Sequence, residues 1–369
     1  MNAYLSNKLR NLSFLLMILV AFIHGYNVNL KFSDGEQFSP ALWLQFVEGF
    51  VSDGICRVAV PMFFAISGYL ATQSLKGEFN TRIYGKILRK RFSSLMVPYL
   101  SVSALGIATV IILQIIPFSR PFFNNFSLGS TTFSKWIWIW LVSPVPYQLW
   151  FLRFLCIYFL LYPVIYFLAK YLKLIFILAL LYFWSSFGLQ QQIGVTKIEV
   201  EGLLFFSIGV FAATSQMNLL YRMPSKTFFL LLAVWTFWVG YRTWINIVPE
   251  LFDHYAVHYH LIGFTSLGFV LFWFLYDEME PIIARSSWIK EYSNYSFGIF
   301  LFHEPCLTIA KKILVRIGAS NDTTLLLTFL LAPVLGFGFG LLLSRMLFRF
   351  TPLFYSFLTG NRKPAHSSE

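Results

Sequence analysis

Ionisable side chains inside otherwise apolar segments are the residues of this sequence that could do chemistry. A charged or titratable group is costly in a membrane helix, so its presence there indicates a function. An imidazole can accept a proton near neutral pH, a guanidinium can stabilise a developing oxyanion, and a carboxylate can orient a neighbouring base. The candidate catalytic residues are His24, Arg57, Arg153, His303 and Glu304.

The positions of these five residues predict a common site. Helix direction alternates along the chain and each residue rises about 1.5 Å, so all five come to similar depths in the outer half of the membrane. His24 is the preferred general base, because burial favours the neutral and basic form of imidazole. His303, oriented by Glu304, is the alternative base. A structural interpretation also stays open, in which the arginines reach the interface and His24 only bonds a neighbouring helix.

The elements that must position these residues are apolar helices. Of the 369 residues, 57% are hydrophobic and only 12% are charged, and the mean hydropathy is +0.67. This composition excludes a soluble globular protein and a disordered one. We expect an all-α, polytopic integral membrane protein with about ten transmembrane helices. The expected spans are 12–30, 55–73, 95–117, 148–168, 172–189, 202–214, 227–247, 260–276, 293–310 and 324–347.

The basic residues divide unequally between alternate connections. With the N-terminus inside, 18 Lys and Arg fall on the inner side and 7 on the outer side. Because basic residues favour cytoplasmic loops, both termini are expected in the cytoplasm. The sequence therefore predicts a single transmembrane domain over 1–350 and a short polar cytoplasmic tail over 351–369. Nucleic acid is not predicted as a partner, since the net charge of +12 comes from these short runs.

A dense run of basic residues between Lys76 and Arg91 predicts a second site. The run contains one acid, Glu78, and more positive charge than topology alone requires. Clustered Arg and Lys can bind a phosphate-rich cytoplasmic ligand, whereas the equal alternative is attraction to anionic lipid. The candidate cofactor-binding residues are Lys86, Arg89, Lys90 and Arg91.

A metal site is not predicted. The three cysteines stand singly in apolar segments, with no spacing typical of zinc ligands. One aspartate and three histidines with ligand-like spacing occur in an expected outer loop, but no second cluster of possible ligands accompanies them. These residues are Asp253, His254, His258 and His260.

Four segments resemble the acyltransferase-3 family of inner-membrane O-acyltransferases. Arg57–Leu70 (RVAVPMFFAISGYL) is similar to the second helix of that family, and Leu88–Phe92 resembles the end of its basic loop. Gln148–Arg153 (QLWFLR) and Ser296–Pro305 resemble two further family segments, the second of which contains the family's late histidine. The resemblance covers residues 8–347.

One position departs from the family pattern. The first helix of the family commonly carries an arginine with ten residues between it and the catalytic histidine, and the corresponding position here is Ser13. Arg10 lies one turn earlier on roughly the same helical face and is a possible replacement. The resemblance supports His24 as the family histidine.

The resemblance implies the activity of an acyltransferase in the bacterial inner membrane. Acetyl-CoA is the implied donor and co-substrate, and a hydroxyl of a cell-surface polysaccharide or lipid-linked glycan is the implied acceptor. Membrane lipids are the other expected partners. The alternative is a secondary transporter of a small polar or anionic substrate, which also has about ten helices with buried charges. A membrane sensor would need a sizeable soluble domain.

The division of basic residues makes a testable prediction about topology. Single cysteines introduced near Lys76–Arg91 should be labelled from the cytoplasm, and one at Tyr255 should be labelled from outside. Labelling of both positions from the same side would contradict the predicted arrangement.

Overall fold

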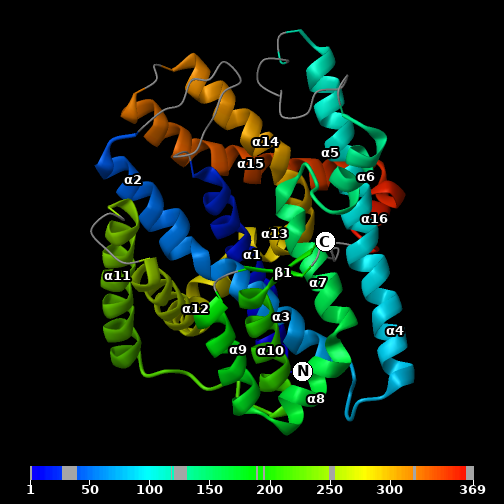
Figure 1. Cartoon of the computed structure of the whole chain (residues 1–369), viewed down its shortest axis with the longest axis vertical. Helices are drawn as coiled ribbons and strands as arrows, with labels where there is room; N and C mark the ends of the chain where they lie inside the picture. The colour runs from blue at the N-terminus through cyan, green and yellow to red at the C-terminus, as the bar shows by residue number, and fades with distance from the viewer. Residues whose placement is uncertain are drawn as a thin grey trace.

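The computed structural model describes residues 2–26, 40–117, 119, 131–187, 190–193, 196–248, 254–318 and 321–362. These residues form a helical bundle, in which helices far apart along the chain lie side by side (Figure 1). The prediction of a helical fold is confirmed. One exception is an antiparallel hairpin in the connection between two helices, in which β1 (Gln190–Ile193) pairs with β2 (Thr196–Glu199).

The helices have the following bounds in chain order: α1 (Ala3–Gly25), α2 (Leu42–Gly49), α3 (Ala59–Gln73), α4 (Thr81–Arg91), α5 (Val97–Ile115), α6 (Phe133–Leu141), α7 (Trp150–Leu160), α8 (Tyr162–Tyr171), α9 (Leu174–Phe187), α10 (Val200–Thr214), α11 (Ser225–Ile247), α12 (His254–Arg285), α13 (Ser287–Tyr292), α14 (Ser296–Ile317), α15 (Asp322–Phe350) and α16 (Pro352–Leu358). Short π or 3₁₀ turns make α2 continuous with α3, and α4 continuous with α5.

Six helices of the described chain are long and apolar enough to cross a membrane. They are α1, α2 with α3, α4 with α5, α11, α12 and α15. A seventh span is possible if α7 and α8, which are bent by 66°, cross together. Each predicted span overlaps a helix, but α9 and α10 are short, so the total of about ten stays a prediction.

Helix α1 lies at the centre of the bundle and packs against α3, α14 and α15. Its first half is fixed by a buried ion pair, because Lys8 Nζ lies 2.7 Å from Asp277 Oδ1 of α12. Lys8 also lies over the Trp273 ring, at 4.1 Å from its centroid. An unpaired charge in this environment is strongly unfavourable, so the pair fixes the position of α1 against α12.

The interruption of α14 places two predicted site residues at a break in the backbone. Glu304 has φ −96° and ψ 141°, which are not helical values. Pro305 follows it, and a proline disfavours the helical conformation of the residue before it. His303 and Glu304 therefore lie where α14 changes direction. Neighbouring α15 runs beside α14 at this level (Figure 1).

The region predicted as a polar tail begins with α16, whose Tyr355 and Leu358 are both 2% exposed. Beyond α16 the chain turns back onto the π-helical turn Phe92–Met96. Asn361 Nδ2 donates to Ser93 Oγ at 3.3 Å. The end of the described chain thus contacts the turn that directly follows the basic run Lys76–Arg91. Residues 363–369 lie outside the described residues.

Close packing of α3 on α10 makes a testable prediction about stability. A Cβ atom at Gly209 would lie 2.0 Å from the backbone oxygen of Ala65, so Gly209→Ala must push the two helices apart. We expect a loss of about 1–3 kcal/mol, measured as a lower Tm of the purified protein. Gly338→Ala is the matched control, because no atom lies within 4 Å of a Cβ there. Equal effects of the two substitutions would contradict the packing argument.

Candidate active site

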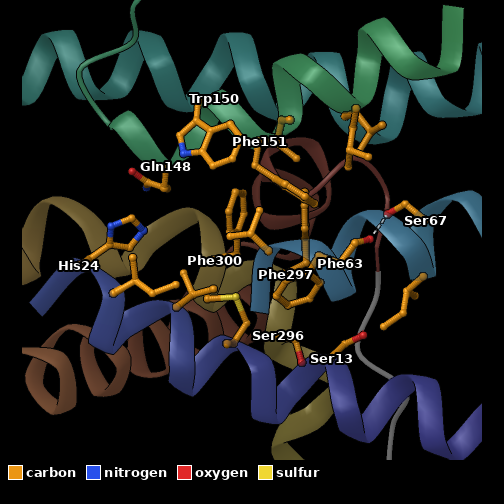
Figure 2. Close-up of a pocket in the computed structure, with 18 of the residues that line it drawn as sticks. Ser13, His24, Phe63, Ser67, Gln148, Trp150, Phe151, Ser296, Phe297 and Phe300 are labelled. Carbon is orange, nitrogen blue, oxygen red and sulfur yellow. Dashed lines mark hydrogen bonds between the residues drawn. The ribbon is translucent and has the colours of Figure 1, made fainter. Parts of the chain in front are cut away.

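A cavity with a volume of about 750 Å³ lies between α1, α3, α7 and α14. Most of its wall is apolar and aromatic (Figure 2). His24 lies at one end of the view, and Ser13 and Ser67 lie toward the other. Such a site can enclose a long flexible molecule and direct it with a few polar groups. The polar lining residues are Ser13, His24, Tyr26, Arg57, Ser67, Arg91, Tyr147, Gln148, Ser296, Lys311 and Arg362.

The imidazole of His24 is joined to Glu304 through a tyrosine. Tyr147 Oη lies 2.5 Å from His24 Nδ1 and 3.5 Å from Glu304 Oε1. In one tautomer, His24 Nδ1 donates to the hydroxyl and the hydroxyl donates to the carboxylate. His24 Nε2 is then an unprotonated acceptor, and no described residue bonds it. This is the arrangement of a base whose tautomer is fixed by a second group.

His303 lies beside His24 but does not line the cavity. The two ring centroids are 5.3 Å apart, and His303 is fully buried. Its Nδ1 lies 3.0 Å from the carbonyl oxygens of Ile299 and Phe300, so Nδ1 carries the proton and donates. His303 Nε2 is buried with no partner in the described chain. The structure therefore gives His24, and not His303, access to a ligand in the cavity.

Lys311 holds the end of α1 and was not among the predicted site residues. Its Nζ donates to the carbonyl oxygens of His24, at 3.2 Å, and Tyr26, at 2.5 Å. These carbonyls belong to the C-terminal end of a helix, where a cation is favoured. Lys311 is 8% exposed and lines the cavity. It therefore fixes the turn that carries His24, although the sequence indicated only an outer-loop lysine.

Arg57 lines the same cavity as His24 and is held by a carboxylate that the sequence analysis did not select. Its Nη2 donates to Glu201 Oε2 of α10 at 2.7 Å. The Glu201 side chain is 5% exposed and that of Arg57 is 30% exposed, so the arginine still reaches the cavity. The only sequence signal for Glu201 was its place immediately before an uncharged apolar segment.

Arg153 does not join the other four predicted catalytic residues in space. Its guanidinium donates to the carbonyl oxygen of Val142, after the end of α6, and lies over the Phe154 ring. Of the five residues expected in one pocket, His24 and Arg57 line the cavity, His303 lies beside His24, and Glu304 is linked to His24 through Tyr147. Arg153 instead supports the segment that leads to Tyr147.

A second cavity, of about 680 Å³, gathers every predicted cofactor-binding residue. The exposed Lys86, Arg89 and Lys90 line it together with the half-buried Arg91. Lys86 lies three and four positions before Arg89 and Lys90 on α4, so these three side chains share one face of the helix. The remaining lining residues are Ser93, Ser94, Gly360, Asn361 and Arg362. Arg91 and Arg362 also line the first cavity, so the two cavities meet at these guanidiniums.

A third cavity, of about 350 Å³, shares Tyr147 with the first. Glu304, Thr308 and Lys312 of α14 line it, opposite the segment Ser143–Pro146. The Tyr147 side chain is therefore part of the wall between the first and third cavities. Its hydroxyl contacts both His24 and Glu304.

The proposed replacement of the family arginine by Arg10 is not supported by the geometry. Arg10 is exposed, donates to Asn7 Oδ1 at 3.2 Å and does not line the cavity. Ser13 does line it, and its hydroxyl donates to the carbonyl oxygen of Leu9. The helical face carrying Ser13 turns inward, whereas Arg10 turns outward.

Two of the histidines with ligand-like spacing, His258 and His260, have other partners. His258 Nε2 lies 2.9 Å from the carbonyl oxygen of Trp184, and His260 Nδ1 accepts from Trp238 Nε1. Asp253 lies outside the described residues. No group of three or more metal-ligating side chains occurs within the described part of the chain.

Comparisons with known proteins identify the family of the chain. The family model described as "Acyltransferase domain", that of the acyltransferase-3 family, matches residues 8–347. The Succinoglycan biosynthesis protein ExoH of Rhizobium meliloti (strain 1021) is 24% identical over 383 residues, which cover 99% of this chain and 95% of that protein. No solved structure matches the chain. Because the family model covers nearly the whole chain, this membrane protein belongs to the acyltransferase-3 family.

Proposed function

We propose that the protein transfers an acetyl group from cytoplasmic acetyl-CoA to a hydroxyl of a cell-surface polysaccharide or lipid-linked glycan. The observation that carries this proposal is the junction between two cavities. One is the second cavity, lined by the cations of α4, which we call the basic cavity, and the other contains His24. A charged nucleotide fits the first, and a flexible acyl-thioester arm fits the second. The bacterial inner membrane is the proposed location, with both termini in the cytoplasm.

The donor is proposed to enter from the basic cavity. The phosphates of CoA would bind the cations of α4, since clustered guanidinium and ammonium groups form charge-assisted hydrogen bonds with phosphate. The arm would pass along the apolar wall toward His24. The distance from Ser13 to His24 along α1 is about 16 Å at the usual helical rise, so the cavity is long enough for an extended arm.

The acceptor is proposed to enter through the third cavity, on the far side of Tyr147. This cavity has hydroxyl, carboxylate and ammonium groups, which suit a sugar better than an acyl chain. The name of the relative from Rhizobium meliloti refers to the biosynthesis of succinoglycan, and this supports a polysaccharide acceptor. The two substrates would then meet at His24 from opposite sides.

The reaction would be a direct transfer with His24 as general base. His24 Nε2 accepts the proton of the acceptor hydroxyl, and the hydroxyl oxygen attacks the thioester carbonyl carbon. A tetrahedral oxyanion forms, and the Arg57 guanidinium stabilises its charge. The C–S bond then breaks, and the leaving thiolate takes the proton from His24. The products are an O-acetyl ester and free CoA.

The remaining candidate residues would act through others. Glu304 orients Tyr147, and Tyr147 fixes the tautomer of His24. His303 packs beside His24 and limits its ring orientation. Arg153 supports the backbone before the segment Ser143–Pro146, so it is proposed as a positioning residue for the acceptor cavity.

The transporter alternative has one observation in its favour. The break of α14 at Glu304 is the kind of interruption that lines substrate sites in transporters. Membership of an acyltransferase family favours acyl transfer instead. A transporter would move its substrate into vesicles without forming free CoA from acetyl-CoA.

The role of His24 is tested by a substitution that keeps a hydrogen-bonding side chain. His24→Gln cannot take a proton, so acetyl transfer should fall by about 10²–10⁴ while the Kd for acetyl-CoA is unchanged. Transfer is measured as release of free CoA in the presence of acceptor, and binding is measured by calorimetry.

His303→Ala is the companion variant for this test. If His24→Gln keeps near-normal turnover and His303→Ala abolishes it, then His303 is the base and the assignment is reversed. If both variants are fully active, the proposed chemistry is wrong.

Removal of the Tyr147 hydroxyl should slow the reaction without preventing binding. Tyr147→Phe breaks the link between His24 and Glu304, and the loss of one hydrogen bond predicts a decrease in kcat of about tenfold. The KM for acetyl-CoA should stay the same, because the Tyr147 hydroxyl is at the His24 end of the cavity and the cations of α4 would bind the phosphates at the other end. Tyr182→Phe is the matched control, since Tyr182 is 67% exposed on α9. An unchanged kcat for Tyr147→Phe would remove this residue from the mechanism.

A further inference from the structure

The C-terminal turn of the described chain enters the wall of the basic cavity. Gly360 and Asn361 both have a φ of 64°, so two successive residues adopt the left-handed conformation and reverse the chain after α16. A Cβ atom at Gly360 would lie 2.4 Å from the Cα atom of Ser94, so only glycine permits this close approach. Asn361 bonds Ser93 and Ser356. These contacts place Arg362 between the basic cavity and the cavity of His24.

Two guanidiniums stand at this junction, and each lies over an aromatic ring. The guanidinium carbon of Arg362 is 3.4 Å from the centroid of the Phe297 ring, and that of Arg91 is 4.8 Å from the centroid of Phe159. Both rings line the cavity of His24. Stacking on an aromatic face orients a guanidinium. The N–H donors lie in the plane of the guanidinium itself, so they stay available to a ligand.

The charge of the junction has no internal counterpart. Neither Arg91 nor Arg362 forms an ion pair with a carboxylate in the part of the chain that the structure describes. Burial and the charge of Arg91 lower the pKa of Arg362 to about 9, so the guanidinium is still charged at neutral pH. Two like charges in a partly buried position repel each other, and an anion placed between them relieves this repulsion.

We propose that Arg91 and Arg362 bind the diphosphate group of the acyl donor, and that the C-terminal turn Thr359–Arg362 is therefore part of the donor site. This inference rests on the proposed function, because it takes a nucleotide with an acyl-thioester arm as the ligand. The family match ends at residue 347, so it does not include this turn. The diphosphate occupies the junction, the nucleoside remains among Lys86, Arg89 and Lys90, and the arm extends toward His24.

The test uses the full-length protein in nanodiscs of phosphatidylcholine and measures CoA binding by calorimetry. Arg362→Ala should raise the Kd for CoA by about ten- to a hundredfold, because charge-assisted bonds to phosphate are lost. The increase should shrink at high salt, where such contacts are screened. Arg349→Ala, an exposed arginine at the end of α15, is the matched control and should leave the Kd unchanged.

Acetyl-pantetheine separates phosphate binding from support of the fold. This donor has no phosphate, so wild type and Arg362→Ala should use it at equal rates. A chain that ends at residue 359 should bind CoA as weakly as Arg362→Ala, whereas a chain that ends at residue 362 should bind like wild type. Equal CoA binding by wild type and Arg362→Ala, or an equal loss of activity with acetyl-pantetheine, would overturn the inference.

Two further outcomes are distinguishable. If wild type in nanodiscs of phosphatidylglycerol binds more of this lipid than Arg362→Ala does, while both proteins bind CoA equally, the junction binds a lipid phosphate and the proposed nucleotide occupant is wrong. If wild type itself binds no CoA at all, the proposed donor fails together with this inference. If wild type binds CoA and Arg362→Ala binds it equally, only the role of the C-terminal turn fails.

Discussion

An ionisable side chain inside an apolar helical bundle needs its partner within the protein, and this constraint organises the site. Lys311 is bonded to the carbonyl oxygens at the end of α1, and Arg57 is paired with Glu201 of α10. Each bond joins elements that are far apart in the sequence. The buried pair of Lys8 and Asp277 and the bonds of Lys311 fix α1 at both ends. His24 is held at the end of a helix that has little freedom to move.

The same constraint explains why the site lies between cavities. Tyr147 uses its one hydroxyl to contact both His24 and Glu304, and its side chain lines both the cavity of His24 and the third cavity. The break in α14 brings Glu304 to that wall, while His303 stays buried behind His24. His24 lines the first cavity, and Tyr147 joins it to the wall of the third cavity. In the proposed acyl transfer, the two substrates would approach this pair of residues from different cavities.

Much of this arrangement was predictable from the sequence. Apolar segments located the helices, because length and hydropathy depend only on local residues. His24 was identified because an imidazole in an apolar segment is unusual. Lys86, Arg89 and Lys90 share one face of α4 because they are spaced by three and four positions. Predictions of this kind need no knowledge of how distant segments pack.

The remaining site residues depend on contacts between distant parts of the chain. Tyr147 lies 123 positions from His24 and carries no signal that distinguishes it from other tyrosines. Lys311 contacts a carbonyl 287 positions away, although its sequence context indicated only an outer loop. Arg153 was expected to join the site, but its guanidinium donates to the backbone carbonyl oxygen of Val142 instead. The partner of Arg153 depends on the direction in which its side chain leaves α7. Hydrophobic periodicity in the sequence carries no information about that direction.

The central claim is that one continuous passage brings an acyl thioester from the basic cavity to His24. The most direct measurement is a cryo-EM structure of the full-length protein with a non-hydrolysable thioether analogue of acetyl-CoA. The account predicts the diphosphate between Arg91 and Arg362, and the acyl end within hydrogen-bonding reach of His24 and Tyr147. An analogue whose acyl end lies outside the cavity of His24, or whose nucleotide lies away from α4, would contradict the account.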